Sequence, residues 1–132
     1  MQQFLRDVTS GRSKERMLNA MRIAIPVTGQ CLEPHFGHCE KFVFTDVDPI
    51  SHQILATTEA PAPEHEPGLL PPWLTQRGVT HVIAGNMGAR ARSLLEDASV
   101  EVMTGAPEQP AQALVRQYLE GTLVTGENSC HH

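Results

Sequence analysis

Short apolar runs separated by turn-forming residues recur along the chain from residue 22 onward, and this pattern predicts its secondary structure. Runs rich in β-branched and aromatic side chains, bounded by Gly, Pro or Asp, are typical of strands. Apolar positions three and four residues apart are typical of helices, which Gly commonly ends. The predicted strands span residues 22–27, 41–48, 52–60, 79–84 and 100–105. The predicted helices are a short one that ends at residue 77, one over 89–98 and one over 107–121.

The resulting element order, β-β-β-α-β-α-β-α, predicts an α/β fold. A mixed sheet of about five strands, flanked by helices, is expected from three consecutive strands followed by two β-α units. This order is similar to the ribonuclease H-like architecture. One domain is expected over residues 21–121, because Met21 begins the first clear strand. Residues 1–20 lack clear alternation and are expected to form a flexible extension, and residues 122–132 an irregular tail.

Composition and charge exclude several classes of protein. The values of 40% hydrophobic and 19% charged residues are ordinary for a globular chain. The net charge is −5, and it becomes −7 when residues 1–20 are set aside, so nucleic-acid binding is not expected. No apolar run is long enough to span a bilayer, and no signal-peptide core is present. Three cysteines suit a reducing compartment better than a disulfide framework, so a cytoplasmic protein is predicted.

Residues 31–39, CLEPHFGHC, hold the densest group of chemically active side chains. Cys31, His35, His38 and Cys39 are ligand types that suit zinc, copper or iron–sulfur species. Their spacing is not that of a zinc finger, and a strand entered at His38 would turn neighbouring side chains to opposite faces. The sequence therefore predicts an open, partial site that holds a larger cluster or is completed from elsewhere. Residues that offer such completion are His65, Cys130, His131 and His132.

The same segment also has an interpretation without metal. In it the histidines are exposed loop residues, Phe36 is a core anchor, and Gly37 supplies a tight turn. The turn Gly85-Asn86-Met87-Gly88 is similarly open to two interpretations. It opens a helix, where backbone N–H groups suit an anion that Arg90 and Arg92 would reinforce. A plain β-α turn is the favoured interpretation, because glycines are common in turns.

Conventional catalysis finds little support in the sequence. The Gly-x-Ser-x-Gly nucleophile elbow of serine hydrolases is absent from the sequence. The Gly-Lys-Ser/Thr ending of a phosphate-binding loop is absent as well. Asp46 and Asp48 lie two residues apart on one predicted strand and form a candidate divalent-metal pair. A hydrolase built on them would need further carboxylates from other elements. The chain is therefore not expected to be an enzyme.

Five stretches together resemble one family. They are MRIAIPV, the HFG of PHFGHC, HEPGLLPPWL, VIAGNMGARA and YLEGTL, and they occur in that order. The chain from Met21 onward is similar to the dinitrogenase iron–molybdenum cofactor biosynthesis family, over about 110 residues, a size typical of one domain. The resemblance implies a ribonuclease H-like fold without nuclease activity. It also implies binding, storage or delivery of metal–sulfur clusters, in some members for nitrogen fixation.

Within this resemblance, cluster binding is attributed to the position of His35. The residues implied at the cofactor site are His35, Phe36, Gly37, His65, Gly85, Asn86 and Gly88. Supplementary metal ligands are expected among Cys31, His38, Cys39, Cys130 and His131. We therefore predict a non-catalytic carrier of an iron–molybdenum or iron–sulfur cluster that exchanges it with a donor or acceptor protein. A homodimer joined through the metal is compatible with this prediction, and a small zinc-binding or metal-free regulatory module is the alternative.

Overall fold

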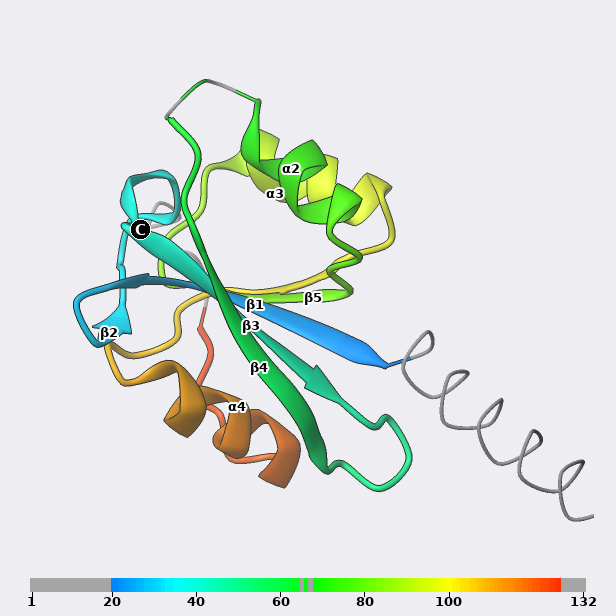
Figure 1. The fold of residues 1–132 in the computed structure, drawn as a ribbon. Coiled ribbons are helices and arrows are strands. Elements are labelled where there is room, and N and C mark those ends of the chain that lie inside the picture. The colour runs from blue at the N-terminus through cyan, green and yellow to red at the C-terminus, as the bar shows by residue number, and fades with distance from the viewer. Residues whose placement is uncertain (1–19, 65, 67, 127–132) are drawn as a thin grey trace, which may run out of the picture.

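A mixed sheet runs through the centre of the protein, with α2 and α3 on one face and α4 on the other (Figure 1). The computed structural model describes residues 20–64, 66 and 68–126. The strands are β1 (Met21–Thr28), β2 (Cys31–Leu32), β3 (Lys41–Val47), β4 (Ile54–Pro61), β5 (His81–Ile83) and β6 (Glu101–Met103). The helices are α2 (Leu70–Gln76), α3 (Ala89–Asp97) and α4 (Ala111–Glu120), with a 3-10 turn, η1 (Phe36–His38).

The strand order across the sheet is β4-β3-β1-β5-β6, and β2 pairs with β1 beside this path. β1 is antiparallel to β3 and parallel to β5, so the sheet is mixed as the element order predicts. β5 and β6 are parallel, because α3 carries the chain back across one face between them. The α/β class is thereby confirmed, whereas the ribonuclease H-like assignment stays a prediction. Within the described residues, every helix is too short or too polar to cross a bilayer.

The sheet departs from the prediction in three local details. β2 was not expected; it forms because Gly29, with a φ of +67°, turns the chain so that Cys31 pairs with Thr28. The strand expected from residue 52 begins at Ile54, since His52 has a φ of +61° and ends the preceding turn. β5 and β6 are shorter than predicted, at three residues each.

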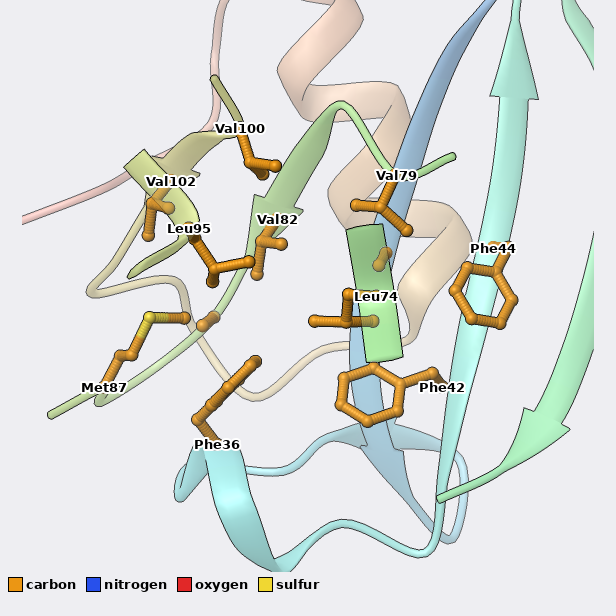
Figure 2. Close-up of a cluster of buried hydrophobic side chains, with 12 residues drawn as sticks. Phe36, Phe42, Phe44, Leu74, Val79, Val82, Met87, Leu95, Val100 and Val102 are labelled. Atoms are coloured by element: carbon orange, nitrogen blue, oxygen red, sulfur yellow. The ribbon is translucent and has the colours of Figure 1, made fainter. Parts of the chain in front are cut away.

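Two apolar clusters, one on each face of the sheet, hold the layers together. The cluster under α4 includes Ile25, Leu114 and Val115, which are fully buried. The cluster under α2 and α3 includes Leu74 from one helix and Leu95 from the other (Figure 2). Truncating a fully buried leucine to alanine costs about 2–5 kcal/mol, so both helices are firmly attached to the sheet. This rigid frame positions the loops at one end of the strands.

Candidate functional site

An open cavity of about 350 Å³ lies where three loops meet at one end of the sheet. The loops are the segment with η1, the connection from β4 to α2, and the turn from β5 to α3. The lining residues are His35, Phe36, Gly37, His38, Glu66, Gly68, Leu70, Pro71, Asn86, Met87, Gly88 and Ala91. The cavity thus brings together residues that were predicted from two separate motifs, the HFG of the first loop and the GNMG turn.

The backbone of the η1 segment is attached to the β5–α3 turn. His35 and Asn86 form an isolated parallel bridge. The N–H of Phe36 donates to the carbonyl of Asn86 at 3.2 Å, and the N–H of Asn86 donates to the carbonyl of Pro34 at 2.8 Å. Because β1 and β5 are parallel neighbours, their following loops emerge at the same edge of the sheet and can make these bonds.

Phe36 and Met87 fasten the two walls of the cavity to the core. They are 6% and 1% exposed, and both belong to the cluster under α2 and α3 (Figure 2). The ring of Phe36 meets that of Phe42 edge-on, with centroids 5.9 Å apart. This anchoring matches the interpretation in which Phe36 is a core anchor. His35 and His38, on either side of it in the sequence, remain exposed.

His35 and His38 are both exposed and present two imidazoles to the cavity. Their ring centroids lie 6.1 Å apart at an interplanar angle of 87°. The N–H of His38 donates to the carbonyl of His35 at 3.0 Å, so η1 holds the two side chains in a fixed relation. Neutral imidazole is a ligand for zinc, iron and copper. The cavity therefore offers two metal-ligating side chains from one turn.

Cys39 lies in the loop before β3, so the divergence of side chains considered for a strand entered at His38 does not apply to it. η1 ends at His38, Cys39 has a φ of −77°, and β3 begins only at Lys41. Cys39 packs against the core cluster that contains Phe36. Burial raises the pKa of its thiol to about 11, and the nearby Glu33 carboxylate adds to this rise. Since the thiolate is the ligating form, Cys39 is a weak ligand at neutral pH.

The remaining predicted ligands are not brought to the cavity by the described residues. Cys31 is half-buried on β2 and is not among the lining residues. His65, Cys130, His131 and His132 lie outside the described residues. In residues 20–64, 66 and 68–126, no three His, Cys, Asp or Glu side chains are grouped closely enough to hold a metal ion.

The β5–α3 turn places the start of α3 at the cavity. Gly88 is the N-cap of α3, without a side-chain hydrogen bond, and both Gly88 and Ala91 line the cavity. Unpaired N–H groups of a first helical turn carry partial positive charge. The anion-site interpretation had Arg90 and Arg92 reinforce this turn, and such reinforcement is not seen in the part of the chain that the structure describes. Neither arginine is among the lining residues, and Arg92 instead pairs with Glu96 at 3.2 Å.

The two aspartates proposed as a hydrolytic pair have structural roles. Asp46 is 7% exposed and receives two bonds from Arg22, Nε to Oδ1 at 2.7 Å and Nη2 to Oδ2 at 3.0 Å. Oδ1 of Asp48 accepts from the N–H of Ile50 at 2.9 Å and so closes the β3–β4 turn. Neither contact leads to the cavity, so these residues give the hydrolase alternative no support.

Two acidic residues of the site were missed by the sequence reasoning. Glu66 lines the cavity from the β4–α2 loop. Glu33 lies behind His35 and accepts a hydrogen bond from its backbone N–H at 3.2 Å. The available signal was their position beside predicted ligands, since Glu66 follows His65 and Glu33 precedes His35 by two residues.

Comparisons with known proteins show which family and which solved structures the chain is similar to. The family model described as dinitrogenase iron-molybdenum cofactor matches residues 19–121. An uncharacterised protein of Methanocaldococcus jannaschii is 29% identical over 106 residues, which cover 78% of this chain and 89% of that protein. The crystal structure of PH0822 has a TM-score of 0.75 at 23% identity and covers 85% of this chain and 100% of that chain. The apo form of the orange protein from Desulfovibrio gigas has a TM-score of 0.65 at 21% identity, over 82% and 94% of the two chains.

Proposed function

The chain belongs to the dinitrogenase iron–molybdenum cofactor family, and on this premise we propose that it binds and delivers a metal–sulfur cluster without catalysing a reaction. The cargo proposed is of the iron–molybdenum or iron–sulfur kind. The observation that carries the proposal is the meeting of His35 and His38 with the start of α3 at one open cavity. At about 350 Å³, this cavity lies in the range of small-ligand sites.

His35 is the proposed primary ligand, with His38 beside it. An imidazole nitrogen ligates iron or molybdenum directly, whereas the start of α3 faces the negative charge of the cluster's sulfides. Leu70, Pro71 and Met87 add apolar surface to the cavity and keep water from part of the bound cluster. In this arrangement the protein supplies shape and partial charge, and the cluster supplies its own bridging sulfides.

Incomplete coordination suits a carrier rather than a permanent cofactor site. The described residues offer two imidazoles at the cavity and no third close ligand. A cluster held in this way keeps open coordination positions, which a donor or acceptor protein can occupy during transfer. Further ligands are proposed among Cys31, Cys39, His65, Cys130 and His131. Cys39 is the weakest of the proposed set, because burial keeps its thiol protonated.

Anaerobic reconstitution with iron, sulfide and molybdate tests the proposal. Metal retained after desalting, and the visible absorption spectrum, are measured for the wild type, His35→Ala and His52→Asn. His52 is an exposed histidine that lines another hollow, beside Ile54 and α4, and asparagine tolerates its positive φ. We expect His35→Ala to lose most of the retained metal and His52→Asn to retain it. A wild type that holds no more metal than His35→Ala would contradict the proposal.

Elemental analysis of protein purified without oxygen distinguishes the cluster carrier from the alternative, a zinc-binding regulatory module. Two imidazoles with centroids 6.1 Å apart are also compatible with a zinc ion completed by other ligands. Stoichiometric zinc without iron or molybdenum would favour a zinc-binding regulatory module. Iron with molybdenum, or iron with acid-labile sulfide, would favour the cluster carrier.

A further inference from the structure

Glu33 joins the end of β1 to the residue that presents the first imidazole. Its backbone N–H donates to the carbonyl of Pro26 at 2.9 Å, which fixes Glu33 beside β1. Its side chain then accepts two hydrogen bonds. Oε1 accepts from the hydroxyl of Thr28 at 2.8 Å, and Oε2 accepts from the N–H of His35 at 3.2 Å.

The hydroxyl of Thr28 connects both ends of the segment that carries the histidines. Besides donating to Glu33, it accepts from the N–H of Glu40 at 3.3 Å. The carboxylate of Glu40 in turn accepts from the N–H of Gly29 at 2.8 Å. The start and the end of the segment are therefore tied to the same turn after β1, and η1 lies between them.

In the described part of the chain, the β5–α3 turn does not bond the N–H of His35, which is bonded by Glu33. Asn86 bonds the carbonyl of Pro34 and the N–H of Phe36, on the two sides of His35. The N–H of His35 itself is bound from the other side, by Glu33. The position of His38 depends on that of His35, because the N–H of His38 donates to the carbonyl of His35.

We propose that Glu33 is a positioning residue of the cluster site, which sets the place of His35 and, through it, of His38. This inference rests on the proposed function. Glu33 is not among the cavity's lining residues, so it acts through the histidine and not on the cluster. Outer partners that bond the ligating ring itself typically change metal affinity about 10- to 100-fold when they are removed. Glu33 bonds the backbone N–H of His35 and not its ring, so an effect at the lower end of this range is expected.

Two substitutions separate placement from charge. Glu33→Ala removes both side-chain bonds. In Glu33→Gln the amide oxygen can accept from the N–H of His35 while the amide nitrogen donates to Thr28, so both bonds are kept and only the charge is lost. Glu108→Ala, at an exposed glutamate before α4, is the matched control for the loss of one carboxylate.

Reconstitution as described above gives the first readout, with iron, sulfide and molybdate as the probe. We expect Glu33→Ala to weaken cluster retention by about tenfold, and Glu33→Gln and Glu108→Ala to stay within about threefold of the wild type. Amide hydrogen exchange of the metal-free protein gives the second. The N–H of His35 should exchange about tenfold faster in Glu33→Ala, as expected for the loss of one hydrogen bond, and at the wild-type rate in Glu33→Gln.

The outcomes separate this inference from the proposed function. Unchanged retention and unchanged exchange in Glu33→Ala, with retention lost in His35→Ala, would overturn the inference and leave the function in place. Equal loss in Glu33→Gln and Glu33→Ala would show that charge matters and would also overturn it. If the wild type retains no cluster, the proposed function fails, and the exchange rates still decide whether Glu33 holds His35.

Discussion

Gly85 lies so close to Pro34 that a Cβ atom on residue 85 would stand 2.9 Å from the Pro34 carbonyl oxygen. The same carbonyl accepts a hydrogen bond from the N–H of Asn86 at 2.8 Å. The requirement for glycine here is one of space, because Gly85 is not among the glycines with positive φ. The contact joins the β5–α3 turn to the segment that carries His35, so the position of that histidine depends on the small size of residue 85.

Gly85→Ala is expected to displace Pro34 and the segment that follows it. The new methyl group would press on backbone atoms, which cannot rotate away, so the free energy of unfolding should fall by about 1–3 kcal/mol. Gly88→Ala is the control for stability: nothing lies within 4 Å of the added Cβ, and its φ of −63° suits alanine. Its cost should stay below about 1 kcal/mol, from the weaker N-cap alone. Urea unfolding measures both, and equal costs would contradict the close packing at Gly85.

Cys39 is expected to react slowly with iodoacetamide near neutral pH. Burial raises the pKa of its thiol to about 11, and only the thiolate is nucleophilic. In a Cys31→Ser, Cys130→Ser background, the alkylation rate should rise about tenfold per pH unit between pH 8 and 10. A rate that levels off by pH 9 would show that the folded thiol is not buried as described.

Protonation of His81 is expected to destabilise the fold. Burial lowers the pKa of His81, and the opposing effect of Glu101, 3.2 Å away, does not offset it. Thr80 also contacts the ring at 2.7 Å, and Tyr118 of α4 packs on it with centroids 5.8 Å apart. Because the folded state disfavours the charged ring, the unfolded chain binds the proton first as pH falls. The free energy of unfolding should therefore decrease below about pH 6.5 and level off below the folded pKa.

His81→Gln should flatten this part of the stability profile. The difference between the wild type and the variant isolates His81 from the other titrating groups. Urea unfolding at several pH values between 5 and 8 measures it. Parallel profiles for the two proteins would mean that His81 does not contribute to the pH dependence.

Asp46→Asn is expected to cost about 1–2 kcal/mol of stability, because it weakens a two-point ionic contact with partly exposed Arg22. The matched control is Glu59→Gln, which removes the ion pair between Lys41 and Glu59 on exposed β4. That pair should be worth less than about 1 kcal/mol. Thermal or urea unfolding of both variants checks the order, and a larger loss in Glu59→Gln would contradict it.

Much of the fold was predictable because the composition of each long strand is visible in the local sequence. β1 and β3 are runs of β-branched and aromatic residues, and both were predicted to within about a residue at each end, as boundaries allow. β2 was not, since two residues carry no periodicity and its pairing depends on the turn at Gly29. The start of β4 was misplaced because a positive φ at His52 leaves no clear mark in the sequence.

The candidate site was predictable in its histidines but not in its geometry. His35 stood out through its motif, whereas its contact with Asn86 depends on β1 and β5 being parallel neighbours. The loop over residues 31–39 was predicted, but its 3-10 turn over residues 36–38 was not, because three residues carry no periodicity. Glu33 carried no motif at all, and its role depends on two hydrogen bonds that only the folded chain makes.

The bridge between His35 and Asn86 has a consequence for the order of events in the cell. The two residues are about fifty positions apart, on loops that follow the parallel neighbours β1 and β5, so we expect the bridge to form after these strands have paired. A nascent chain that has exposed His35 but not yet Asn86 holds its imidazoles on a segment that lacks the support of the β5–α3 turn. We therefore expect the cavity to be completed late in folding, and a donor of the proposed cluster that recognised the whole cavity would distinguish a finished molecule from an unfinished one.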